Sequence, residues 1–266
     1  MNVEGRVLEG KVALISGTAG GQGRAAAIAF AEAGAKVLGC DVNAEHARET
    51  VELVRACGGE MVSVQPVDLA DPKQAAGWID EAVRTWGGVD ILYNNAAALF
   101  ARGPFAESTL EEWDLTIRNE LTIVYVVCRA VWSHFMDRGG GVIINTASVS
   151  GHLELHPMRS AAHGAAKAGV LALTRMLAVE GAPHGIRAVS LSPGVTRAPA
   201  TKRFWDGTPE QRAVGDALLS RVPLGRVAEP KDIAEVALFL ASPAAGYITG
   251  TDLLVDGGVA SASYHS

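Results

Sequence analysis

Residues 12–24 read VALISGTAGGQGR, and this stretch decides the fold. An apolar strand pattern, Val12–Ser16, runs without interruption into a turn with glycines at 17, 20, 21 and 23, and a helical pattern begins near Arg24. A strand, a glycine turn and a helix N-terminus in this order bring backbone N–H groups and the positive end of a helix dipole to one point. The stretch therefore predicts a site for the pyrophosphate of a dinucleotide.

The same alternation of strands and helices continues along the whole chain. Apolar strands without polar alternation, each followed by an amphipathic helix, are typical of a parallel sheet covered on both faces. The sequence predicts one doubly wound α/β domain over residues 1–266 with a seven-stranded sheet. The predicted strands are Val12–Ser16, Lys36–Asp41, Met61–Gln65, Val89–Tyr93, Val142–Thr146, Ile186–Leu191 and Asp252–Val255. The predicted helices are Arg24–Ala33, Ala44–Cys57, Pro72–Trp86, Leu110–Met136, Ala162–Gly181 and Pro230–Ala241.

The composition of the chain limits the binding partners and the cellular compartment that we expect. The 266 residues include 23 Lys and Arg against 29 Asp and Glu, a net charge of −6, which argues against nucleic acids and anionic membranes as partners. No apolar run is long enough for a membrane helix, and the N-terminus does not resemble a secretory signal. Cys40, Cys57 and Cys128 show neither a disulfide pattern nor a metal-ligand spacing, so we expect a cytoplasmic protein without a metal site.

Several later motifs accompany the glycine turn. Asp41 closes the second strand 18 residues after Gly23, where a carboxylate can bind both ribose hydroxyls. With Gly17, Gly21 and Gly23 in a GxxxGxG pattern, and with NNAA, AAK, SPG, FLAS, ITG and VDGG farther along, the chain resembles the short-chain dehydrogenase/reductase family. The resemblance covers the chain from Gly10 to Gly258. It implies a Rossmann-type fold, a nicotinamide cofactor and a homotetramer.

The cofactor expected from these residues is NAD. The carboxylate of Asp41 would repel the 2′-phosphate of NADP, and no arginine stands beside it. The resemblance also implies that Asp68 holds the adenine amino group, that Asn95 lines the nicotinamide ribose, and that the segment from Pro193 to Thr196 packs near the carboxamide. Gln22 stands where the family usually has an aliphatic residue.

At the residues expected to carry out the reaction, the chain departs from the family that it resembles. The family uses an Asn, a Ser, a Tyr and a Lys, and the resemblance assigns the first, second and fourth roles to Asn119, Ser148 and Lys167. The third position holds His163. One helical turn separates His163 from Lys167, so the ammonium group lies beside the reacting group and disfavours a protonated imidazole. The resemblance implies that Lys167 also binds the nicotinamide ribose. Neutral His163 would then serve as a base for alcohol oxidation better than as an acid for ketone reduction.

Two further segments are expected to lie near this site, and we interpret each of them in turn. The polar loop residues His152, Glu154, His156 and Arg159 either replace the missing acid or are ordinary solvated loop residues. Residues 198–223 form an insertion that we interpret as a mobile substrate lid, or else as a surface excursion with no ligand role. Within this insertion Phe204, Trp205 and Leu218 suggest apolar substrate contacts.

The sequence therefore favours an NAD(H)-dependent oxidoreductase that interconverts a secondary alcohol and a ketone on a small to medium, largely apolar substrate. Two alternatives remain open at this stage. One is a non-redox enzyme of the same fold in which neutral His163 transfers a proton during dehydration, epimerisation or cyclisation. The other is a catalytically silent dinucleotide-binding sensor or scaffold.

Overall fold

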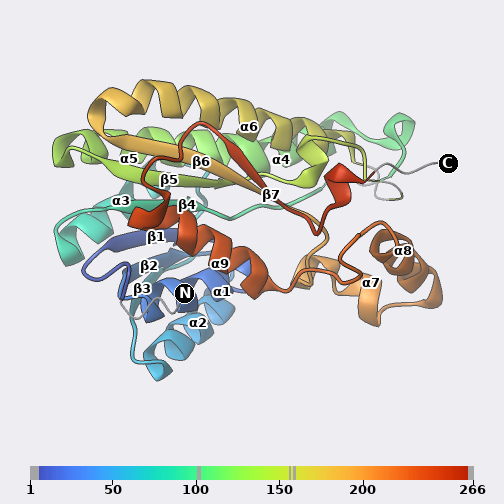
Figure 1. Ribbon diagram of the computed structural model, residues 1–266, viewed down its shortest axis with the longest axis horizontal. Helices are drawn as coiled ribbons and strands as arrows, with labels where there is room; N and C mark the ends of the chain where they lie inside the picture. Colours follow the sequence, from blue (N-terminus) through green and yellow to red (C-terminus); the bar gives the residue numbers. More distant parts are fainter. Residues whose placement is uncertain (1–5, 101–102, 156, 158–159, 263–266) are drawn as a thin grey trace.

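The computed structural model describes residues 6–100, 103–155, 157 and 160–262, and its strands form one parallel sheet (Figure 1). The sheet has seven strands in the order β3-β2-β1-β4-β5-β6-β7. This architecture confirms the predicted doubly wound α/β fold. The strands are β1 (Val12–Ser16), β2 (Lys36–Cys40), β3 (Glu60–Val64), β4 (Ile91–Asn94), β5 (Gly141–Thr146), β6 (Ile186–Pro193) and β7 (Asp252–Val255).

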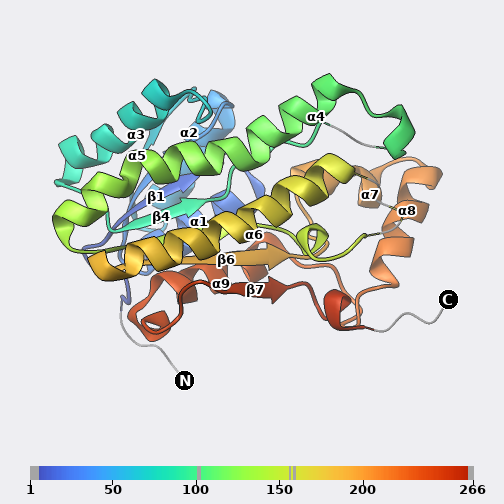
Figure 2. The ribbon, with the colours of Figure 1, turned by 90° about the horizontal axis from the view of Figure 1, so that it is seen from above.

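Helices cover both faces of the sheet, and each layer encloses its own apolar core (Figure 2). The buried rings of Trp78 and Phe135 belong to one core, and Phe30 and Leu240 belong to the other. Burial on both faces explains why the strands are apolar without alternation. The first layer holds α3 (Pro72–Trp86), α4 (Leu110–Ile117), α5 (Ile123–Arg138) and α6 (Ala161–Gly181), and the second holds α1 (Gly21–Glu32), α2 (Ala44–Ala56) and α9 (Pro230–Ala241).

The ends of α3 illustrate how local sequence sets these boundaries. The Asp71 carboxylate accepts hydrogen bonds from the amides of Lys73 and Gln74, and Pro72 occupies the first helical position, where no N–H is needed. Gly87 ends the helix in the left-handed conformation with φ of 82°. The prediction of Pro72–Trp86 is confirmed at both ends because each end carries its own signal.

The predicted single helix over Leu110–Met136 is wrong in one respect. A π-helical turn, Arg118–Thr122, separates α4 from α5, and α5 continues to Arg138. Such a turn adds a residue to the helix and changes which side chains face the neighbouring elements, and it is frequent at functional sites.

The insertion at residues 198–223 is more ordered than its proline content suggests. It contains α7 (Arg203–Asp206) and α8 (Pro209–Leu219), which lie at one end of the molecule beyond the sheet (Figure 1). Its apolar residues pack with Val149 and Leu155 into a third, small core. Leu218 is fully buried in that core, so the expectation that it contacts a substrate is wrong.

Candidate functional site

A cleft of about 760 Å³ lies along the carboxyl ends of the strands. It follows the junction between β1 and β4, where the strand order reverses and where ligands of doubly wound sheets bind. The glycine turn after β1 lines one end, and residues of β5, α6 and the segment after β6 line the other. The cleft therefore brings residues from the two halves of the chain to one place.

The glycine turn that lines the cleft, called the glycine cradle below, packs so closely against neighbouring backbone that two of its positions have no room for a side chain. Gly17 has φ of +74°, and a Cβ atom on it would lie 2.9 Å from the Cα of Ala96. A Cβ atom on Gly23 would overlap the carbonyl oxygen of Gly17. Helix α1 begins inside this turn, at Gly21, three residues earlier than the sequence pattern indicates. The exposed backbone amides at its start fit the pyrophosphate of a dinucleotide.

Asp41 follows β2 and lines the cleft next to this turn. Its carboxylate accepts hydrogen bonds of 2.9 Å from the backbone amides of Ala19 and Asn43. The two amides fix the position of this carboxylate on the cleft wall, where it can accept hydrogen bonds from hydroxyl groups of a ligand.

Asp68 also lines the cleft, but it has a protein partner that sequence reasoning did not anticipate. Arg118, in the π-helical turn, donates to both carboxylate oxygens at 2.7 and 3.3 Å. These hydrogen bonds lower the pKa of Asp68. The ion pair connects the segment after β3 to the π-helical turn, which also carries Glu120.

The remaining residues expected at the cofactor lie on the cleft wall. The side-chain amide of Asn95 donates to the carbonyl oxygens of Ser16 at 3.0 Å and Gly17 at 3.4 Å, which fixes β4 against the start of the glycine turn. Pro193, at the end of β6, and Thr196 line the opposite side together with Gln22. The expected cofactor residues other than Gly23 therefore line one cleft.

The four residues expected to carry the chemistry all line the same cleft. Ser148 follows β5, and its hydroxyl accepts a hydrogen bond from the Ser150 amide at 3.1 Å. His163 and Lys167 lie one turn apart on α6 and both line the cleft. The Lys167 ammonium is buried and donates to the Thr146 carbonyl oxygen at 3.0 Å. Burial lowers the pKa of Lys167, and the carboxylate of Glu120 acts in the opposite direction.

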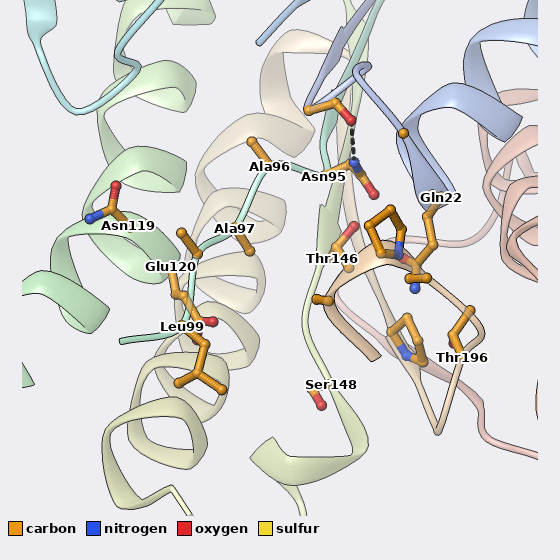
Figure 3. Close-up of a pocket in the computed structure, with 18 of the residues that line it drawn as sticks. Gln22, Asn95, Ala96, Ala97, Leu99, Asn119, Glu120, Thr146, Ser148 and Thr196 are labelled. Atoms are coloured by element: carbon orange, nitrogen blue, oxygen red, sulfur yellow. Dashed lines mark hydrogen bonds between the residues drawn. The ribbon is translucent and has the colours of Figure 1, made fainter. Parts of the chain in front are cut away.

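Asn119, the fourth residue, also lines the cleft. Its side-chain amide donates to the carbonyl oxygen of Leu115 at 2.8 Å. The side chain of the next residue, Glu120, points into the cleft (Figure 3), and its Oε2 lies 2.7 Å from the Nδ1 of His163. The role expected for Asn119 stays a prediction, and the side chain in contact with His163 is a buried carboxylate that the sequence analysis did not anticipate.

The comparisons with known proteins agree with this geometry. The family profile described as enoyl-(acyl carrier protein) reductase matches residues 17–260. A 3beta-hydroxysteroid dehydrogenase of Eggerthella lenta is 40% identical over 95% of this chain and 94% of its own. A 7 alpha-hydroxysteroid dehydrogenase solved with NADH and 7-oxo glycochenodeoxycholic acid superposes with a TM-score of 0.88, at 30% identity and 97% coverage of both chains.

The chain belongs to the short-chain dehydrogenase/reductase family. It is an oxidoreductase of that family, whose fold binds a nicotinamide dinucleotide. Cofactor use differs among the structural neighbours. A putative 2-deoxy-D-gluconate 3-dehydrogenase of Agrobacterium tumefaciens contains NADP and superposes with a TM-score of 0.86, at 32% identity over 97% of this chain and 100% of its own. Among the helices that the structure describes, none has the length and apolarity needed to cross a membrane.

The polar loop of this dehydrogenase/reductase is partly outside the described residues, which exclude His156 and Arg159. The Nε2 atom of His152 lies 2.9 Å from Asp252 Oδ2 and 3.3 Å from Ser192 Oγ, so this ring binds the sheet edge. Neither His152 nor the exposed Glu154 lines the cleft, which gives no support to the idea that either one replaces the acid of the family.

Proposed function

We propose that this protein is an NAD(H)-dependent oxidoreductase that interconverts a secondary alcohol and a ketone, with His163 as the acid/base group. The observation that carries the proposal is the meeting of His163, Ser148 and Lys167 in the cleft that also holds the glycine cradle. A buried lysine among apolar neighbours needs a polar ligand to offset its desolvation, and the ribose of a nicotinamide nucleotide provides hydroxyl oxygens.

Each residue has a distinct task in this proposal. Lys167 binds the nicotinamide ribose, Ser148 donates a hydrogen bond to the substrate oxygen, and His163 takes the hydroxyl proton during oxidation or returns it during reduction. When bound, the nicotinamide accepts or supplies the hydride. Gly17, Gly21 and Gly23 would cradle the pyrophosphate, and Asp41 would hold the adenosine ribose.

The charge of Asp41 supports NAD rather than NADP as the cofactor. A 2′-phosphate would bring negative charge against its carboxylate, which the Ala19 and Asn43 amides hold in place. The structural neighbours include complexes of both cofactors, so the preference rests on this side chain.

A small to medium, largely apolar substrate fits the remainder of the cleft. Leu99, Val149, Leu155 and Phe204 line it near His163 and Ser148. Buried Phe204, from α7, supports the interpretation of residues 198–223 as a segment that covers the substrate, whereas Trp205 packs on Phe204 and Arg197. We further propose that the protein acts in the cytoplasm as a homotetramer.

The deciding experiment mixes the purified chain with NAD and a panel of secondary alcohols, from small polyols to steroids, and follows the absorbance of the reduced nicotinamide. Oxidation of apolar alcohols with NAD, and weaker turnover with NADP, is the expected result. NAD binding without turnover of any alcohol would reject the proposal and leave the proton-transfer enzyme or the silent sensor.

A further inference from the structure

The contact between Glu120 and His163 joins two groups that the sequence separates by 43 residues. Glu120 belongs to the π-helical turn and is 2% exposed, whereas the His163 side chain is 17% exposed and reaches the cleft. An ionised carboxylate is costly to bury unless hydrogen bonds and charge compensate it. The Nδ1 atom of His163 lies within hydrogen-bond distance of the carboxylate, at 2.7 Å, and the ammonium of Lys167 supplies nearby positive charge.

We propose that Glu120 is the positioning residue of His163: its carboxylate accepts a hydrogen bond from Nδ1–H, fixes the ring and leaves Nε2 free toward the substrate. A histidine nitrogen that is bound to a carboxylate carries the proton, so the other nitrogen is the base. The role rests on the function proposed above, in which His163 exchanges a proton with the substrate.

The proposal gives the alcohol oxidation a complete proton balance. The O–H bond of the substrate breaks as its proton bonds to Nε2 of His163. The adjacent carbon loses its hydrogen with both electrons to the oxidised nicotinamide, and the carbonyl double bond forms. The imidazole then carries one positive charge, which the Glu120 carboxylate stabilises at its other nitrogen. Reduction of the ketone follows the same path in reverse.

The charges around His163 now differ from those expected from the sequence. The sequence places only the ammonium of Lys167 beside the ring, and that charge opposes the imidazolium. In the described part of the cleft, Glu120 and Lys167 are the charged groups at this end, and their charges are opposite. Glu120 therefore offsets the repulsion and lets His163 serve in both directions of the reaction.

A purely structural role is the competing explanation, since the contact also joins α6 to the π-helical turn. Two variants separate the explanations. Glu120→Leu removes both the hydrogen bond and the charge, whereas Glu120→Gln retains a hydrogen-bond acceptor and removes only the charge. Glu111→Gln, at an exposed glutamate of α4 outside the cleft, is the matched control.

The first measurement is the ¹⁵N NMR spectrum of the histidine rings in the cofactor-free protein, with His163→Gln used to assign the signals. In the wild type above neutral pH we expect a protonated Nδ1 and a free Nε2 on His163. Glu120→Leu should lose this preference, and Glu120→Gln should form the imidazolium only at lower pH than the wild type. Unchanged His163 signals in both variants would overturn the proposal.

The second measurement is the pH profile of kcat with the best alcohol. Glu120→Leu should lose about 10²-fold in kcat, whereas Glu120→Gln should move the acid limb of the profile to lower pH. Altered ring signals with an unchanged kcat and profile would overturn the positioning role. Absence of turnover in the wild type itself, with the ring signals changed as expected, would reject the proposed function while the Glu120–His163 assignment stands. Glu111→Gln should match the wild type in both measurements.

Discussion

The carboxylate of Asp41 accepts a hydrogen bond of 2.9 Å from the backbone amide of Ala19, so the end of β2 is tied to the turn after β1. The second oxygen accepts from the Asn43 amide, also at 2.9 Å. These bonds keep a negative charge in one position on the cleft wall, where it can discriminate between two cofactors that differ by a phosphate.

We therefore predict that NAD binds at least about 10-fold more tightly than NADP, which corresponds to about 1.4 kcal/mol. Asp41→Asn keeps an acceptor for the amides but removes the charge, so the variant should lose most of the discrimination. Titration calorimetry with both nucleotides measures the effect, and Asp80→Asn on exposed α3 surface serves as the control. Equal or tighter binding of NADP by the wild type would overturn the prediction.

Phe204 and Leu218 come from the same insertion but face different surroundings, and their alanine variants should differ accordingly. Phe204 lines the cleft, so Phe204→Ala should raise KM for bulky apolar alcohols by about 10-fold and leave NAD binding intact. Leu218 is fully buried in the small core, so Leu218→Ala should lower the free energy of unfolding by about 2–5 kcal/mol. Steady-state kinetics and urea unfolding of both variants test the contrast, which fails if Phe204→Ala leaves KM unchanged.

Apolar side chains on the outer surfaces of α5 and α6 lead to a prediction about assembly. Tyr125, Met176 and Val179 are 55, 57 and 72% exposed, and the two helices lie on the same side of the sheet (Figure 2). Exposed apolar surface of this kind marks a contact with another subunit.

We expect light scattering to report four times the chain mass of 27.7 kDa at micromolar concentration. A double variant, Met176→Glu with Val179→Glu, should dissociate the assembly, whereas Lys231→Glu on α9 should not. A monomeric wild type would contradict the prediction.

The fold could be predicted from the sequence because each boundary has a local cause. Strands β1 and β7 have the predicted ends, and α3 and α9 also match. The two strands are apolar runs flanked by turn residues. The two helices each begin with proline at the first helical position.

The break in the long helix could not be predicted in the same way. An α-helix advances by about 100° per residue, so an added residue in the π-helical turn changes which side chains face the neighbouring elements. The family resemblance assigned a role to Asn119 and none to Glu120. Glu120, between Asn119 and Leu121, has no local sequence signal of its contact with His163, which lies 43 positions away. The pairing of Arg118 with Asp68 escaped prediction for the same reason, because the two residues are 50 positions apart.

Lys167 should make stability depend on pH in a defined direction. Burial lowers its pKa in the folded protein below the ordinary value of 10.5. At pH values between the lowered pKa of the folded protein and the ordinary pKa of the unfolded chain, the unfolded chain binds more protons than the folded protein. The free energy of unfolding therefore rises with pH in this range. The cofactor-free Lys167→Met variant lacks this contribution, so the wild type should gain stability relative to it as pH rises toward 10.5. Urea unfolding at several alkaline pH values tests this, with Lys73→Met on exposed α3 surface as the control, and a constant difference would disprove it.

His163 leads to the last prediction, because the chain departs from the family at this residue. If its imidazole exchanges the substrate proton, His163→Ala should lose at least about 10²-fold in kcat while NAD binding is retained, since a positioned general base contributes that much. Added imidazole should restore part of the rate in this variant, because the Glu120 carboxylate remains in place to hold it, whereas a merely structural histidine would not be rescued. His184→Ala, at an exposed position after α6, should behave as the wild type.

His163→Tyr then separates the candidate functions. The tyrosine restores the residue of the family but has no ring nitrogen to bind the Glu120 carboxylate. A gain of ketone reduction would indicate an alcohol dehydrogenase site adjusted by one residue. Loss of a native activity without any redox gain would instead favour the proton-transfer enzyme. Full activity of His163→Ala in every assay would remove His163 from the mechanism, and Glu120 with it.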